Sequence, residues 1–239
     1  MRIKLFIILG LTILSLPTQS QSQFSGWLAS FNTFNGKGKT SIHLDVQMRS
    51  TNEWKEMQTF LARTGLNVKL KKNLIATVGY AYIRNRRSIS GVTGYAPEHR
   101  IWEQLLFTHT WKRASIAHRF RLEQRFISKS NIQNAILENE GNDFANRFRY
   151  FIRALLPLNN TKPFTNGLFV ALQDEIFSNI GDKSPVNGKT FDQNRAYIAL
   201  GYRLKTSFDL EAGYLNQYVE GRNGFTNNHV VQVAGYLRL

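Results

Sequence analysis

The chain has 239 residues, of which 42% are hydrophobic and 20% are charged, so its composition excludes a disordered protein and suits one large β domain or two small ones. Its 31 basic residues outnumber its 16 acidic residues, and the formal charge of +15 points to an anionic partner: nucleic acid, lipid headgroups or a solute. Cysteine is absent, which excludes disulfides and thiolate chemistry.

The N-terminus has the three-part layout of a secretory signal peptide. Arg2 and Lys4 precede an apolar run over 5–16, and Pro17 with small polar residues follows. A membrane anchor is the alternative, but the run is shorter than the roughly 20 residues that a spanning helix needs. We predict a signal peptide over 1–20, cleaved between residues 20 and 23, and an exported chain without a transmembrane helix.

The rest of the chain repeats one pattern, in which apolar and polar residues alternate with a period of two. In IAHRFRLEQRF, for example, Phe120 and Leu122 alternate with Arg119, Arg121 and Glu123. Each segment is close to the 9 to 11 residues with which a tilted strand crosses a bilayer. The segments are 40–50, 60–70, 73–83, 100–111, 116–126, 147–156, 167–177, 195–204, 207–219 and 230–239.

Short turns alternate with long polar connections between these segments. The turns are 71–73, 112–114, 205–207 and the slightly longer 158–163. The long connections, rich in Gly, Asn, Ser and charge, are 84–99, 128–143, 178–190 and 220–228. Outer-membrane barrels show this asymmetry, with short turns in the periplasm and long external loops. By this rule the last strand runs inward and ends in the periplasm.

The strand count is left open by the sequence. Residues 40–239 hold ten strands, and the segment FSGWLASFNTF (24–34) would be an eleventh. Because bacterial barrels have an even number of strands, we expect either twelve strands, with one not recognised, or ten, with 24–34 as a periplasmic or plugging segment.

The fold class that this pattern predicts is all-β: a single antiparallel transmembrane β-barrel of about 10–12 strands over 24–239. Backbone groups in a bilayer must be paired internally, which a closed barrel achieves, and its outer face must be apolar. Phe120 and Leu122 are then expected to face lipid, and Arg119 and Arg121 the lumen. A soluble β-barrel that binds an anionic ligand is the alternative, and it would bury the apolar face instead.

The polar positions of the strands predict an arginine-rich lumen. Eleven arginines and five acids share this phase, so we expect ion pairs that join neighbouring strands and some positive charge left over. A purely structural network and an anion path are both open. The lumen network is predicted to contain Arg119, Arg121, Glu123, Arg125, Arg147, Arg149, Arg153, Gln173, Glu175, Gln193, Arg195 and Glu211. The same phase holds Asp45, Arg49, Arg63, Gln104, Arg203, Asp209, Gln217 and Arg238.

Enzymatic chemistry is weakly indicated. No metal-binding spacing such as HExxH occurs, NGKGK (35–39) lacks the pattern of a phosphate-binding loop, and no G-x-S-x-G element is present. We therefore predict no catalytic residues, no metal and no cofactor. A lipid-modifying hydrolase is the alternative, in which His229 would act with a serine at a loop end: Ser88, Ser90 or Ser128.

Several segments also resemble a known family. RIWEQLLF, HRFRLEQRF, NRFRYFIRALLPL and FDQNRAYIALGY resemble DUF2490, a bacterial family of unknown function whose members look like outer-membrane β-barrels. The resemblance covers nearly the whole chain after the signal peptide. The chain departs from many such barrels, because its last residue is Leu239 and theirs is Phe. The resemblance to the family implies a fold and a location, and it implies no activity.

The sequence thus predicts a bacterial outer-membrane β-barrel that is not an enzyme. Its expected role is structural, or that of a narrow passive channel, which the arginine-rich lumen could make anion-selective. Its expected partners are outer-membrane lipids and, during biogenesis, the barrel-assembly machinery. Arg84, Arg86, Arg87 and Lys183 are the cations expected to contact lipopolysaccharide. No nucleic acid is expected, because basic residues are not clustered in one run, and a monomer is predicted.

Overall fold

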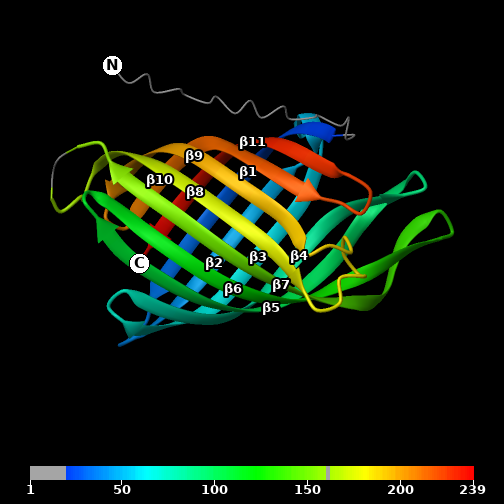
Figure 1. Ribbon diagram of the computed structural model, residues 1–239, viewed down its shortest axis with the longest axis horizontal. Helices are drawn as coiled ribbons and strands as arrows, with labels where there is room; N and C mark the ends of the chain where they lie inside the picture. The colour runs from blue at the N-terminus through cyan, green and yellow to red at the C-terminus, as the bar shows by residue number, and fades with distance from the viewer. Residues whose placement is uncertain (1–19, 160–161) are drawn as a thin grey trace, which may run out of the picture.

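The computed structural model describes residues 20–159 and 162–239, and in this part of the chain eleven strands close into a barrel (Figure 1). No helix within these ranges is long and apolar enough to cross a membrane. The predicted signal peptide lies outside the described residues except for its last residue, Ser20. The strands are β1 (Ser20–Asn35), β2 (Thr40–Ser50), β3 (Met57–Lys71), β4 (Leu74–Ile89), β5 (Val92–Trp111), β6 (Ala114–Gln133), β7 (Ile136–Pro157), β8 (Gly167–Ile180), β9 (Phe191–Lys205), β10 (Phe208–Glu220) and β11 (Phe225–Arg238), with a 3-10 turn, η1 (Asn52–Trp54), between β2 and β3.

The barrel closes through a parallel pair. Each strand is antiparallel to its neighbour in sequence, but β1 pairs with β11 in parallel, from Ser20 opposite Phe225 to Thr33 opposite Arg238. The segment 24–34 is therefore a wall strand, and the expectation of an even count was wrong. An odd number of strands closes here because the first and last strands run in the same direction.

The two ends of the barrel differ. At one end, here the turn end, the connections are 36–39, 72–73, 112–113, 158–166 and 206–207. At the other, here the hairpin end, they are 51–56, 90–91, 134–135, 181–190 and 221–224. The asymmetry comes mainly from two long hairpins, β4–β5 and β6–β7, that project beyond the wall (Figure 1).

These hairpins correct two predicted loops. Most of 84–99 and 128–143 is paired strand, and each hairpin closes in a two-residue turn. Ser90 and Gly91 have φ of 45° and 85°, and Asn134 and Ala135 have φ of 50° and 61°. Two successive positive φ values match the twist of an antiparallel pair, so the strands stay paired up to the turn. Polar composition suggested loops because these strands lie outside the apolar belt.

The two faces of the wall are oriented as predicted. Phe120 and Leu122 are 44% and 38% exposed on the outside, whereas Arg121 and Arg149 are 1% and 5% exposed on the inside. Phe148 and Ile152 also face outward. A soluble barrel would place these apolar side chains in its interior, so the fold is that of a transmembrane β-barrel.

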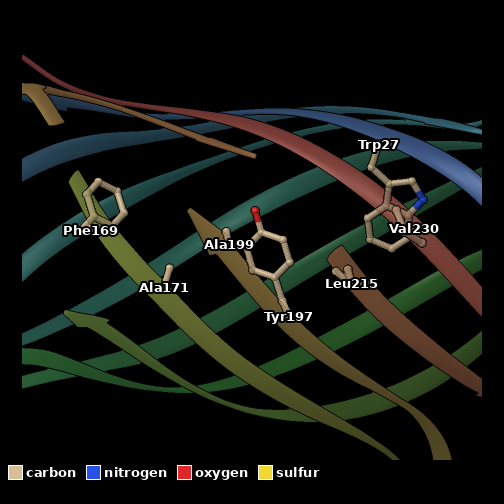
Figure 2. Close-up of a cluster of buried hydrophobic side chains, with 7 residues drawn as sticks. All are labelled: Trp27, Phe169, Ala171, Tyr197, Ala199, Leu215 and Val230. Atoms are coloured by element: carbon tan, nitrogen blue, oxygen red, sulfur yellow. The ribbon is translucent and has the colours of Figure 1, made fainter. Parts of the chain in front are cut away.

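The interior also has an apolar wall, which was not predicted. Figure 2 shows its side chains projecting inward from β1 and from β8 to β11. They are Trp27, Phe169, Ala171, Tyr197, Ala199, Leu215 and Val230. On the opposite side Trp102 lies over Gly65 and Gly79, where added Cβ atoms would come within 2.8 and 2.5 Å of its ring. The lumen is thus part ionic and part aromatic.

Candidate functional site

Two neighbouring strands supply most of the lumen arginines. On β6 the inward positions hold Arg119, Arg121, Glu123 and Arg125, and on β7 they hold Arg147, Arg149 and Arg153. Because alternate residues of a strand point to the same face, the Arg-x-Arg spacing places one guanidinium above the next inside the barrel. Arg121 and Arg149 lie directly opposite one another across the β6–β7 pair.

Carboxylates at the hairpin half of the lumen bind these arginines into one layer. Glu98 accepts from Nε of Arg100 over 2.7 Å and from Nε of Arg125 over 2.6 Å. Glu123 accepts from Arg147 over 2.7 Å, and Nη1 of Arg147 donates to Asp192 over 2.8 Å. We call Glu98, Arg100, Glu123, Arg125, Arg147 and Asp192 the ion-pair layer. It joins β5, β6, β7 and β9, and all six residues have little exposure to solvent.

Further acids each hold arginines of other strands, some of them across the lumen. Glu175 accepts from Arg119 over 2.6 Å and from Nε of Arg149 over 2.9 Å. Asp45 accepts from Arg63 over 3.0 Å, in a pair that is almost fully buried. Nearer the turn end, Glu211 pairs with Arg153, and Asp209 pairs with both Arg203 and Arg238. Every acid of the predicted lumen set therefore already has an arginine partner.

A cavity of about 580 Å³ lies between the ion-pair layer and the turn end. Lys39 and Lys72 lie among its lining residues at the turn end, so the cavity reaches that end of the barrel. We call it the arginine chamber. It is lined by two acids, Asp45 and Glu175, and by seven arginines: Arg49, Arg63, Arg119, Arg121, Arg149, Arg153 and Arg195. Its walls thus carry more positive than negative charge.

Aromatic rings line the same chamber. The guanidinium carbon of Arg49 lies 4.0 Å from the ring centre of Trp27, and that of Arg119 lies 4.1 Å from the ring centre of Phe151. Arg153 lies 5.2 Å from the ring centre of Tyr236. Cation–π contacts of this kind hold a guanidinium in place without neutralising its charge.

Several guanidinium atoms inside the barrel lack an acceptor. The Nε atoms of Arg49, Arg63 and Arg119 and the Nη1 atom of Arg121 are buried and have no hydrogen-bond partner among the described residues. An unsatisfied buried donor costs about 1–3 kcal/mol, and more when it is charged. The chamber therefore favours the entry of a group that accepts hydrogen bonds and carries negative charge.

The mouth at the turn end is basic. The five connections there contain Lys37, Lys39, Lys72, Lys112, Arg113 and Lys162 and no acidic residue. The connections at the hairpin end contain both signs: Glu53, Glu56 and Asp182 beside Lys55, Lys183, Lys189 and Arg222. A second cavity of about 720 Å³ at the turn end is lined in part by Lys112, Arg153, Lys162, Arg203 and Arg238. Anions are attracted to such a mouth and cations are repelled.

All twelve residues of the predicted network lie inside the barrel. Gln193 accepts from Nε of Arg195 over 3.1 Å, and Gln173 accepts from Arg153 over 3.3 Å. The residues that sequence reasoning missed are Trp27, Glu98, Arg100, Trp102 and Asp192. Arg100 and Trp102 alternate with Gln104 on the same face of one strand, and Gln104 was predicted to face inward. The alternation could therefore have identified both residues. Glu98 was hidden because it fell in a predicted loop.

The residues of the hydrolase alternative do not come together in the described part of the chain. His229 lies on the outer face, and its Nδ1 is 2.6 Å from the hydroxyl of Tyr214. The Ser88 hydroxyl accepts a hydrogen bond from the Thr93 hydroxyl, and the Ser128 hydroxyl donates one to Asn142. Within the same ranges no group of three or more His, Asp or Glu side chains is placed to hold a metal ion.

The cations predicted to contact lipopolysaccharide lie on or near the projecting hairpins. Arg86 pairs with Glu56, Arg84 lies 4.5 Å from the ring centre of Tyr95, and Arg87 donates to the backbone of Ser128. Arg86 and Arg87 thus use part of their hydrogen-bonding capacity within the protein, and Lys183 lies in the connection 181–190. Binding of lipopolysaccharide stays a prediction.

Comparison with known proteins gives a family and one solved fold. A family model described as "Protein of unknown function (DUF2490)" matches residues 24–229. A solved structure titled "NanC porin structure in rhombohedral crystal form" is similar, with a TM-score of 0.48 at 12% identity over 85% of this chain and 92% of that chain. No curated protein matches the chain.

Proposed function

The chain belongs to the DUF2490 family of proteins of unknown function, and from its geometry we propose that it is a non-enzymatic, narrow, anion-selective channel of the bacterial outer membrane. The observation that carries the proposal is the charge of the arginine chamber, in which seven arginines and two acids line one cavity inside the barrel. Positive charge in a confined lumen attracts anions and excludes cations.

The basic mouth supports the same proposal. An anion that approaches the turn end meets lysines on several connections before it reaches the chamber. In the orientation predicted from the turns, this mouth faces the periplasm and the hairpins face outward. The proposed environment therefore includes outer-membrane lipids around the apolar belt, with a single barrel as the working unit.

The ion-pair layer limits the passage. Its arginines and acids form a buried network in the hairpin half of the lumen, and the side chain of Glu123 is 1% exposed. An ion that crosses the barrel must pass through this layer. We therefore expect a small unit conductance and not the large current of a wide water-filled porin.

A planar bilayer experiment tests the proposal. The purified barrel is inserted under a KCl gradient, and the sign of the reversal potential reports whether chloride or potassium carries the current. We expect chloride. Arg119→Gln, in the chamber, should lower the preference for chloride, whereas Arg222→Gln, in the connection 221–224, should leave it unchanged. A preference for potassium contradicts the proposal, and the absence of current in a folded barrel would leave the structural role instead.

A further inference from the structure

Two arginines of the chamber, Arg49 and Arg195, have no carboxylate partner in the part of the chain that the structure describes. Within the described residues no acid oxygen lies within 4.0 Å of the guanidinium nitrogens of Arg49 or Arg195. Arg49 donates to Gln47 over 2.6 Å, and Arg195 donates to Gln193 over 3.1 Å. Both acceptors are neutral amides, so neither positive charge is neutralised by a direct ion pair.

The acids nearest to these two arginines are engaged elsewhere. Asp45 binds Arg63, and it reaches Arg49 only through the amide of Gln47. Glu175 lies opposite Arg195 in the β8–β9 register, but it accepts from Arg119 and Arg149. Each of these acids is therefore already paired with another arginine of the lumen.

A single indole brings the two charges together. The guanidinium carbons of Arg49 and Arg195 lie 4.0 and 5.1 Å from the ring centre of Trp27. Arg49 reaches it from β2 and Arg195 from β9, so strands far apart in the sequence converge on one residue of β1. All three residues line the arginine chamber. Two like charges that contact one indole repel one another, and an anion bound beside them would reduce that repulsion.

We propose that Arg49 and Arg195, both stacked against Trp27, form a binding site for a small organic oxyanion, a carboxylate or a phosphate ester with an apolar body. The guanidinium forks bind two oxygens at once, which matches carboxylate and phosphate groups. Phe31, Leu215 and Tyr236 line the same chamber and offer an apolar surface to the rest of the molecule. The site deepens the proposed function, on which it rests, by naming the class of anion that the chamber holds.

Equilibrium binding to the full chain in detergent micelles tests the site separately from conductance. Benzoate, acetate and inorganic phosphate are titrated at constant ionic strength against chloride, and heat and tryptophan fluorescence are recorded. We expect saturable binding of benzoate, several-fold tighter than binding of acetate because of the apolar wall. Trp27→Phe should remove the fluorescence change and identify its source, since Trp102, Trp54 and Trp111 would still emit.

Two substitutions and one control complete the test. Arg49→Gln and Arg195→Gln should each weaken benzoate about tenfold or more, the usual effect of losing a charged hydrogen bond. Arg222→Gln, outside the chamber, should bind as the wild type does. If either Gln variant does not fold, Arg49→Lys and Arg195→Lys keep the charge but lose the fork, and weaker binding is still expected.

The outcomes separate the site from the channel. Benzoate binding that is insensitive to both arginines, or that only follows ionic strength, overturns the site even when the current is chloride-selective. Binding that depends on Arg49 and Arg195 in a barrel without current supports the site and overturns the channel.

Discussion

Arg147 and Glu123 form a two-pronged ion pair inside the barrel: Nη2 and Nε of Arg147 lie 2.7 and 3.1 Å from one carboxylate oxygen. The other oxygen of Glu123 accepts from Arg149 over 2.6 Å. Both arginines come from β7 and the acid from β6, so a single carboxylate holds two arginines of the neighbouring strand. Such a pair, once formed, is costly to break from one side.

Removal of this acid should destabilise the barrel. In Glu123→Gln the buried guanidinium groups of Arg147 and Arg149 lose a counter-charge, and we expect a loss of about 3–5 kcal/mol in the free energy of unfolding. Urea titration in lipid vesicles, followed by tryptophan fluorescence, measures it. The same substitution at the exposed Glu138 should leave the midpoint near that of the wild type. Equal midpoints for the two variants would show that the layer does not stabilise the fold.

The second prediction concerns the packing of the Trp102 ring against Gly65 inside the barrel. Because an added Cβ at Gly65 would lie 2.8 Å from the Trp102 ring, Gly65→Ala should destabilise the barrel by about 1–3 kcal/mol, the usual range for overpacking. Gly235→Ala is the matched control, since its Cβ would meet its nearest neighbour at 3.7 Å. Both are measured by the same urea titration. Trp102→Phe combined with Gly65→Ala should recover part of the loss, and no recovery would contradict the steric explanation.

The fold could be predicted from the sequence as far as local alternation determines it. Arg121 and Phe120 were assigned to the correct faces because a lipid belt and a charged lumen impose opposite chemistry on adjacent residues. Strand number was not determined in this way. Whether β1 pairs with β11 in parallel depends on how the two ends of the sheet meet, and no pattern within either strand reports it.

The sequence predicted which residues line the lumen, but not which of them contact one another. Alternation placed Arg49 and Arg195 in the lumen, yet it could not show that they meet at Trp27, because β2, β9 and β1 converge only once the barrel has closed. Trp27 itself was missed because an indole resembles a lipid-facing residue in sequence. The apolar wall cannot be recognised by composition, because its residues are of the same types as those of the outer belt. Only their positions in the alternation of each strand distinguish the two.

A charged side chain on the outer face should destabilise the barrel more strongly the closer it lies to the middle of the bilayer. Leu200 projects outward from β9 into the apolar belt, opposite Val170 and Ala212, and Ile180 is the last residue of β8, at the hairpin end. Leu200→Arg should lower the free energy of unfolding by about 2–4 kcal/mol, and Ile180→Arg by about 0–1 kcal/mol. Refolding into vesicles and titration with urea give both values. Equal costs at the two positions would contradict the placement of the belt.

The basic mouth should govern how strongly the channel prefers anions at low salt. Replacement of Lys39, Lys72 and Lys112 by Gln removes three positive charges from the turn end without touching the ion-pair layer. We expect the chloride preference in a KCl gradient to fall at about 0.01 M salt, where charges act over roughly 30 Å, and to change little at 1 M, where they act over roughly 3 Å. Lys129, Lys183 and Lys189, at the hairpin end, provide the matched triple substitution to Gln. Because that end already carries acids of similar number, its variant should shift the reversal potential less at either salt. A larger shift from the hairpin-end variant would show that anions are selected there and that the turn end is not the electrostatic entrance.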